Sequence, residues 1–426
     1  MKKGEGTNTW YRLDNAALIF PAIQKESYSS IYRFSAVMTE PVDPAALQRA
    51  VNRTMPRFPS FGVRIRRGTF WYYMEPNSAP GPFVQPDIAN PCQPVRFKED
   101  NSWLVRFFYY DRRISIEVYH AVSDGGGALV FFRTLLAAYL RELGHPIPAG
   151  NGVLDLDEPP RKEELEDAYQ KYATDGATRG MGSSKAYPAT GTPEPFYTLN
   201  TTLGFVPVDQ VKAKAKEYGA SITEYLAAIL LEALMEMQAE ERPRHPLPVA
   251  LAVPINLRSW FPSETLRNFI LNVRPAIDPA LGEYTFAEIV GQVHHYMRLN
   301  INRQQMQAQM TRNVRFQQNK LIQIAPLGLK DLVMGIVYQF VGSRPYSATF
   351  TNPGAFSVPR EMEPHIQRME VVLGQAYEAK SNCAAISFGN TLAISFAGTI
   401  RETELEKRFF RHLVWDGIPV KVESNR

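Results

Sequence analysis

The chain has 426 residues, of which 45% are hydrophobic and 21% charged, and this suits one large or two medium-sized globular domains rather than a disordered or fibrous chain. Its 47 basic and 43 acidic residues leave a net charge of +4, too small to indicate a nucleic-acid-binding protein, although a local basic patch for a phosphorylated cofactor stays open. Cys92 and Cys383 match no metal or redox spacing, so we expect a reducing, cytoplasmic location.

We expect neither a secretory signal nor a membrane span. The first residues lack an apolar core. The most apolar long stretch, residues 321–341, is interrupted by Pro326, Lys330 and Asp331. We interpret it as a buried helix, while an acyl-channel lining or contact with a membrane surface stays open.

The first half opens as an α/β pattern. Residues 30–37 are extended, and Asp43 with Pro44 supplies an N-cap and a first-turn proline for a helix ending near Pro56. Residues 61–73 then predict a two-strand ribbon.

A predicted hairpin delivers His120. Residues 104–110 and 113–119 form its strands, and residues 128–140 predict a helix. His120 is therefore expected where a strand ends, on a turn opened by the three glycines 125–127, which let backbone approach a ligand or another strand closely.

The second half carries several local start and turn signals. Residues 161–197, rich in charge and then in Gly, Ser, Thr and Pro, predict a linker or a lid over the site. The further signals are the capping boxes Ser221 with Glu224 and Thr285 with Glu288, a buried strand over 247–253, a hairpin at Gly389-Asn390, and a last helix over 403–414.

His120 is the candidate general base, since imidazole changes protonation near neutral pH. Asp124, four residues on, has two open roles: it can orient the imidazole, or it can face away and pair with a distant cation. The alternative is an ordinary hydrogen-bonded core histidine. No Gly-x-Ser-x-Gly motif supports a serine hydrolase, and no metal motif is present in the sequence.

The run His120 to Gly125 resembles the HxxxDG signature of the CoA-dependent acyltransferase superfamily, which includes chloramphenicol acetyltransferase and peptide-synthetase condensation domains. Residues 253–258 with Asn268-Phe269 resemble a segment of bacterial alcohol acetyltransferases and wax ester synthases, the branch that fits best. Tyr119 stands where condensation domains usually have a second histidine, and no carrier domain is evident, so the sequence argues against peptide synthesis.

The resemblance implies roles for further residues. Arg258 would form a bidentate pair with Asp124, and Gly125 would support the turn. Residues 343–355 resemble a family turn at a strand end, so Thr351 and Asn352, together with Ser123, are candidate contacts to substrate or oxyanion.

The implied fold is α/β (α+β), with two chloramphenicol-acetyltransferase-like subdomains, each a mixed sheet with flanking helices, and an active-site tunnel between them. We expect residues 1–160 and 198–426 to be the two subdomains and 161–197 the linker or lid.

The implied reaction moves an acyl group, most simply acetyl, from CoA to an alcohol or amine, with acyl-CoA as donor substrate and no permanently bound cofactor or metal. Two alternatives stay open: a carrier-protein-bound donor in lipid, polyketide or peptide assembly, and a non-catalytic binding protein on the same fold.

Overall fold

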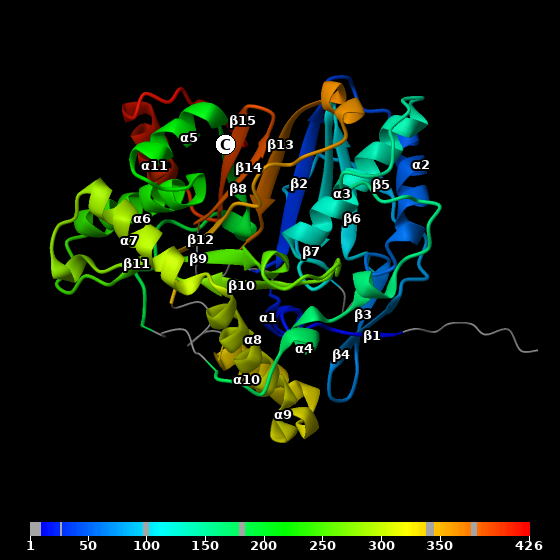
Figure 1. The fold of residues 1–426 in the computed structure, drawn as a ribbon, viewed down its shortest axis with the longest axis horizontal. Coiled ribbons are helices and arrows are strands. Elements are labelled where there is room, and N and C mark those ends of the chain that lie inside the picture. The colour runs from blue at the N-terminus through cyan, green and yellow to red at the C-terminus, as the bar shows by residue number, and fades with distance from the viewer. Residues whose placement is uncertain (1–9, 26–27, 97–101, 179–183, 338–344, 376–380) are drawn as a thin grey trace, which may run out of the picture.

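Two large sheets organise the chain. The computed structural model describes residues 10–25, 28–96, 102–178, 184–337, 345–375 and 381–426. Their strands form a five-stranded sheet, an eight-stranded sheet and a small three-stranded sheet. Figure 1 shows the two large sheets side by side, each with helices on its outer side. This arrangement confirms the predicted mixed α/β fold with two subdomains.

The five-stranded sheet carries the strand that ends at His120. Its order is β13-β2-β7-β6-β5, with β5 parallel to β6 and the other pairs antiparallel. The strands are β2 (Ile31–Met38), β5 (Val84–Pro86), β6 (Val105–Tyr110), β7 (Arg113–Tyr119) and β13 (Ile366–Leu373). The predicted hairpin of β6 and β7 is confirmed.

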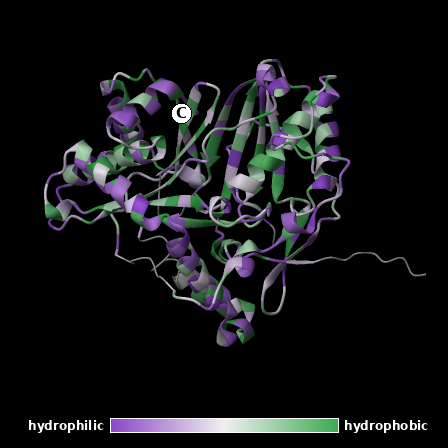
Figure 2. Ribbon diagram, viewed as in Figure 1, coloured by the Kyte–Doolittle hydropathy of each residue, from purple (hydrophilic) through white to green (hydrophobic). Residues whose placement is uncertain are grey.

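Helices α2 (Pro44–Thr54) and α3 (Gly125–Glu142) pack against each other on this sheet. Asp43 caps α2 as predicted, accepting hydrogen bonds from the backbone N–H groups of Ala45 and Ala46. Beneath them, the rings of Phe61 and Phe131 stack with centroids 4.6 Å apart. In Figure 2 hydrophobic residues line α3 and the strands that it covers.

The small sheet lies at the lower edge of this subdomain in Figure 1, next to the short helix α1 (Ile19–Ile23). Its strands are β1 (Tyr11–Arg12), β3 (Val63–Arg67) and β4 (Tyr72–Pro76), and β3 pairs with β4 as the predicted ribbon.

The eight-stranded sheet forms the second subdomain, in the order β10-β9-β12-β14-β15-β8-β16, with β11 pairing β9. Its strands are β8 (Asn200–Pro207), β9 (Val249–Asn256), β10 (Ile270–Val273), β11 (Ala276–Ile277), β12 (Ala348–Thr351), β14 (Ser381–Phe388), β15 (Thr391–Gly398) and β16 (Lys421–Ser424). Its helices are α5 (Val208–Glu217), α6 (Ile222–Glu240), α7 (Phe286–Asn300) and α11 (Glu404–Trp415).

Local signals in this half are confirmed. Ser221 with Glu224 and Thr285 with Glu288 form the predicted capping boxes of α6 and α7, each with both reciprocal hydrogen bonds. The predicted hairpin at Gly389-Asn390 joins β14 to β15.

One strand crosses the expected subdomain boundary. β13 lies within residues 198–426, yet it pairs along its length with β2 of the first subdomain and also packs against β14 and β15. The five-stranded sheet is therefore completed by a segment from late in the chain. The boundaries 1–160, 161–197 and 198–426 stay a prediction.

The segment expected to be a linker is partly built into the fold. Its helix α4 (Ala168–Tyr172) packs against α8 (Arg303–Gln318). Glu164 accepts hydrogen bonds from both terminal nitrogens of Arg57, at 2.6 and 2.8 Å, and both side chains are buried. This ion pair ties the segment to the first subdomain.

The apolar stretch over 321–341 differs from its prediction as one buried helix. Its described part forms two short helices, α9 (Lys320–Ile324) and α10 (Leu327–Val337), and α10 exposes Leu329, Leu332 and Val333. Residues 338–341 lie outside the described residues. Among the described residues, no helix has both the length and the apolar character that crossing a membrane requires.

Candidate active site

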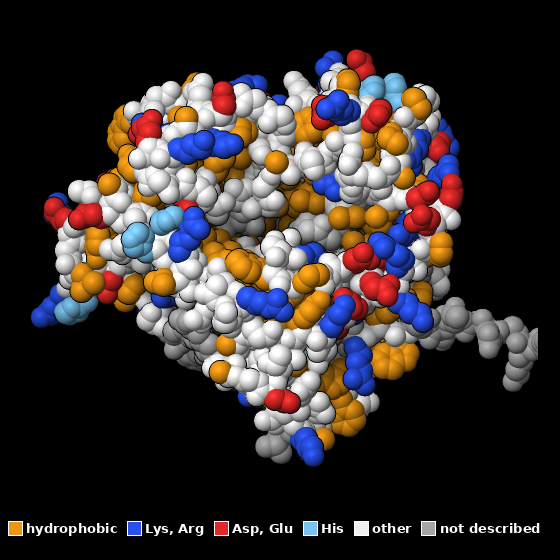
Figure 3. Space-filling model, in the orientation of Figure 1, with side chains coloured by type: hydrophobic (Ala, Val, Ile, Leu, Met, Phe, Trp, Pro, Cys, Tyr) orange, Lys and Arg blue, Asp and Glu red, His pale blue; other side chains and the backbone are white. Residues whose placement is uncertain are grey.

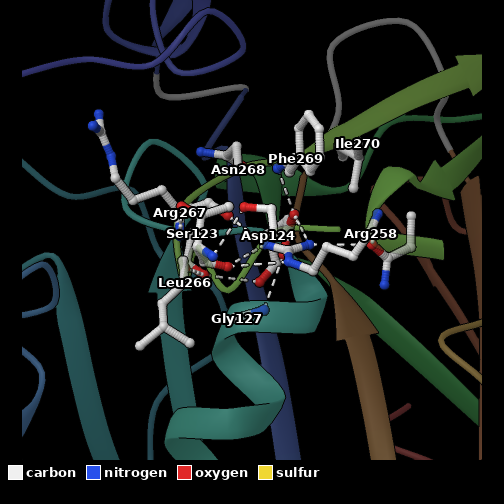
Figure 4. Close-up of polar contacts among 12 residues, drawn as sticks. Ser123, Asp124, Gly127, Arg258, Leu266, Arg267, Asn268, Phe269 and Ile270 are labelled. Carbon is white, nitrogen blue, oxygen red and sulfur yellow. Dashed lines mark hydrogen bonds and ion pairs between the residues drawn. The ribbon is translucent and has the colours of Figure 1, made fainter. Parts of the chain in front are cut away.

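Asp124 is the N-cap of α3 and faces away from His120. Its Oδ1 accepts a hydrogen bond from the Gly127 N–H at 3.0 Å, inside the first helical turn. Its Oδ2 accepts one from Phe269 N–H at 2.7 Å and one from Arg258 Nη1 at 2.8 Å. Figure 4 shows these contacts converging on the carboxylate. The sequence left two roles open for Asp124. In the structure its carboxylate pairs with a distant cation, Arg258, which is the second of these roles.

The ion pair expected between Arg258 and Asp124 is present, but it is not bidentate. Only Nη1 reaches the carboxylate, because Nη2 donates to the backbone carbonyls of Thr265 and Arg267, at 2.9 and 2.7 Å. The guanidinium thus holds the 265–269 loop and the start of α3 together, and it connects the two subdomains.

The glycines form the first turn of α3 rather than an open turn, because the Asp124 side chain caps the helix there. A Cβ at Gly127 would overlap the carbonyl oxygen of Leu266. At Gly125 it would lie 3.7 Å from the Phe34 ring, an ordinary contact. The steric need for glycine therefore falls on Gly127, while the supporting role expected of Gly125 stays a prediction.

Ser123 is fully buried and donates its hydroxyl hydrogen to the backbone, with Leu266 O at 2.6 Å and Asp124 O at 3.0 Å. A hydroxyl used in this way does not face a substrate. We therefore leave Ser123 out of the reaction proposed below.

His120 is held through Asn268. The amide nitrogen of Asn268 donates to the His120 carbonyl at 3.0 Å and to Asp14 Oδ2 at 3.2 Å, so its carbonyl oxygen is the atom that faces His120 Nδ1, at 3.0 Å. An amide oxygen only accepts, so Nδ1 must carry the proton and Nε2 keeps its lone pair. This is the tautomer that a general base at Nε2 needs.

Asp14 fixes the Asn268 amide from a fully buried position. Its other oxygen accepts the Ala17 N–H at 2.8 Å, and Arg267 Nε lies 3.7 Å from Oδ2. Burial raises the pKa of Asp14, against the opposing effects of Arg267 and these hydrogen bonds.

Two aromatic rings enclose the imidazole. Phe20 of α1 stacks on His120 with centroids 4.7 Å apart, and Tyr32 of β2 meets it edge-on at 5.2 Å. Burial lowers the pKa of His120 below its usual 6.5, and Asp124, Asn268 and Asp14 oppose this only in part. His120 is therefore neutral at pH 7, with a basic nitrogen available.

Asn352 and Thr351 lie at the end of β12, and Asn352 is tied to its own surroundings. Its side chain donates to Thr223 Oγ1 at 3.1 Å and accepts the Gly354 N–H at 3.0 Å. Thr351 pairs with Ala384 of β14 and is partly exposed. Residues 343 and 344 of the expected family turn lie outside the described residues. A substrate contact by Thr351 or Asn352 stays a prediction.

Asp14, Phe20 and Tyr32 were not predicted as site residues from the sequence, and no role was predicted for Asn268. Asn268-Phe269 did carry a signal, as part of the segment that resembles alcohol acetyltransferases. Asp14 and Phe20 precede His120 by about a hundred residues with no local pattern, so their convergence is a product of the tertiary fold.

The chain matches no protein-family model and no curated protein sequence. Its structure is similar to polyketide synthase associated protein 5 from Mycobacterium tuberculosis, over 94% of this chain and 96% of that one, with 15% identity and a TM-score of 0.60. A variant of the starter condensation domain of rhizomide synthetase, in complex with C8-CoA, covers 96% and 95% of the two chains, with 13% identity and a TM-score of 0.61. The epimerization domain of tyrocidine synthetase B covers 98% of both, with 12% identity and a TM-score of 0.58.

These matches run nearly end to end, so the described part of the chain has the two-subdomain fold of these condensation and epimerization domains. Identities of 12–15% show the fold alone. The predicted alcohol acetyltransferase branch stays a prediction.

Proposed function

We propose that the protein is an acyltransferase that moves an acyl group, in the simplest case acetyl, from a CoA thioester to an alcohol or amine. The observation that carries this proposal is the state of His120. Asn268 holds the proton on Nδ1, and burial lowers the imidazole pKa, so Nε2 is a free base at neutral pH.

In the proposed reaction Nε2 of His120 takes the proton of the acceptor O–H or N–H as the acceptor oxygen or nitrogen attacks the thioester carbonyl. The carbonyl π pair moves onto oxygen, and this oxyanion is stabilised by nearby donors, for which Thr351 and Asn352 are the candidates. The carbonyl re-forms, the C–S bond breaks, and the CoA thiolate takes the proton back from Nε2. One base serves both steps, and no acyl-enzyme forms.

Asp124 and Arg258 act as supports in this scheme. They hold the start of α3 against the 265–269 loop. Asn268 belongs to that loop, and its side chain accepts the hydrogen bond from His120 Nδ1. The site is thus assembled from both subdomains. Figure 3 shows the surface hollowed between the two subdomains, consistent with a substrate path there.

Acyl-CoA is the favoured donor because one structural neighbour was determined in complex with C8-CoA. The second candidate donor is a carrier-protein thioester, favoured by the condensation domains among the neighbours. Both donors present the same thioester to the same base.

Thiol release from acetyl-CoA and longer acyl-CoAs, with a panel of alcohols and amines, tests the proposal. Release should require an acceptor, collapse in His120→Ala, and persist in His245→Ala, a matched change in an exposed loop. Release that survives in His120→Ala would remove His120 from the mechanism. Release from a carrier-bound donor only would favour the second candidate, and none from either donor would favour a binding protein.

A further inference from the structure

The first part of α10, residues 327–333, turns an apolar stripe to the outside. Leu327 and Lys330 are buried and Asp331 is partly buried, while Leu329, Leu332 and Val333 are 53%, 61% and 48% exposed. These three residues follow the i, i+3, i+4 spacing of one helical stripe. A surface helix normally turns its apolar stripe to the core, so this orientation indicates an apolar partner on the outside.

The reversed orientation is fixed by contacts with the β3–β4 hairpin. Lys330 Nζ donates to Phe70 O at 2.8 Å and lies 3.5 Å from the centre of the Trp71 ring. Tyr72 donates its hydroxyl hydrogen to Asp331 Oδ2 at 2.9 Å, and Leu327 N–H donates to Thr69 O at 3.0 Å. Burying the leucines by rolling the helix would break all of these bonds.

The two preceding helices, α8 and α9, also expose apolar and basic side chains. Phe316 of α8 and Ile324 of α9 are exposed, as are Arg312, Arg315 and Lys320. Residues 303–333 contain five basic residues and one acidic residue, in a chain whose net charge is only +4. In Figure 1 α8, α9 and α10 project below both subdomains. Figure 3 shows hydrophobic and basic side chains mixed at this lower end of the molecule.

We propose that the α8–α10 surface, formed by Phe316, Ile324, Leu329, Leu332 and Val333 with the neighbouring Arg312, Arg315 and Lys320, docks onto an anionic phospholipid bilayer. The combination of apolar side chains and exposed Lys and Arg on short helices suits burial among lipid headgroups, with the cations on the anionic surface. The surface projects from the molecule and carries an excess of cations, which favours a broad anionic surface over a second copy of this chain.

The surface is connected to the candidate active site. α10 packs against α1, and Phe20 of α1 stacks on His120. Resting on the proposed function, this connection points to an acceptor or acyl chain that partitions into the bilayer and reaches the site from it.

Co-sedimentation with vesicles tests the docking directly. The wild type should bind vesicles that contain about a quarter phosphatidylglycerol, bind pure phosphatidylcholine less, and be released by salt. The triple variant Leu329→Ser, Leu332→Ser, Val333→Ser should bind at least about tenfold more weakly. Arg315→Glu with Lys320→Glu should abolish the preference for anionic vesicles, which tests the surface without touching α10.

The matched control is Phe196→Ser with Leu281→Ser, at side chains 96% and 79% exposed outside this surface, which should leave binding unchanged. His120→Ala should also bind as the wild type, so loss of turnover and loss of docking are separate results. No binding to anionic vesicles, or equal binding by the triple variant, would overturn the proposal. The proposal would also be overturned if the wild type did not bind vesicles but self-associated, and the triple variant abolished that self-association. The surface would then bind a second copy of this chain.

Discussion

Asn268 offers the sharpest test of how His120 is prepared as a base. Its side chain makes three hydrogen bonds, to His120 Nδ1 and His120 O at 3.0 Å each and to Asp14 Oδ2 at 3.2 Å. Asn268→Ala removes all three. Asn268→Asp keeps an acceptor at Nδ1 but places a charge beside the ring and beside Asp14.

The expected magnitudes follow from these contacts. A hydrogen bond of this kind contributes about 1 kcal/mol net, and a buried acceptor left without its donor costs about 1–3 kcal/mol. The bond to Nδ1 bears on the tautomer, so Asn268→Ala should lower kcat/KM by about 5- to 30-fold. The two lost donations should lower stability by about 1–2 kcal/mol, because Asp14 Oδ2 still accepts the backbone N–H of residue 268 at 3.3 Å.

The pH dependence separates the two variants. The hydrogen bond that His120 Nδ1 donates to the Asn268 side-chain oxygen raises the pKa of His120, so its loss in Asn268→Ala should move the acid limb of kcat/KM to lower pH. A carboxylate at this position would stabilise the imidazolium, so Asn268→Asp should move the limb to higher pH. In the wild type the limb should lie below 6.5, since burial lowers the pKa of His120.

Two measurements check this reasoning. Once a substrate pair is known, thiol release measured from pH 5 to 9 gives the pH dependence of kcat/KM. The 15N chemical shifts of the His120 ring report its tautomer and pKa without substrate. Thermal unfolding of both variants separates lost stability from lost chemistry. If the ring shifts show a mixture of tautomers in the wild type, or if neither variant moves the His120 titration, the role assigned to Asn268 is wrong.

Three further predictions concern the supports of the site. Asp124→Asn should lower the free energy of unfolding by about 3 kcal/mol, because it leaves a largely buried guanidinium without its anion; urea denaturation measures this, and a loss under about 1 kcal/mol would contradict the argument. Gly127→Ala should cost about 1–3 kcal/mol by pushing on the Leu266 carbonyl, whereas Gly125→Ala should stay within about 1 kcal/mol of wild type, and equal melting temperatures would contradict this contrast. Glu164→Gln should cost about 3–5 kcal/mol by breaking the buried pair with Arg57, and limited proteolysis near residue 164 should become faster, unlike in Glu163→Gln at an exposed neighbour.

Features encoded within a few residues were predicted well. Asp43 with Pro44 and the two capping boxes mark helix starts through bonds that span three positions, and Gly389-Asn390 marks its hairpin. His120 was found because strand, motif and helix are contiguous. The pairing of Asp124 with Arg258 came from resemblance, since 134 positions separate the two residues.

Features that depend on distant segments were not predictable. Nothing local in residues 366–373 says that they pair with β2, and nothing local in Asp14 says that it meets Asn268. The glycines were expected to open a turn that lets backbone approach a ligand or another strand, but the Asp124 side chain caps a helix there, and Gly127 lies against the Leu266 carbonyl. The stretch over 321–341 was predicted as one buried helix, but its described part forms two helices, and Leu329, Leu332 and Val333 of α10 are exposed.

The late arrival of β13 has a consequence for biosynthesis. Strand β2 ends at Met38 and its neighbour β13 begins at Ile366, so roughly 330 residues must be made between them. At about 5–20 residues per second the ribosome needs roughly 20–60 s for this interval. Throughout that time one edge of β2 lacks its partner strand, and an unpaired edge invites pairing with other nascent chains. The first subdomain thus completes its sheet only after residues 366–373 have been made, and until then the open edge of β2 is a surface that a chaperone for nascent chains would protect.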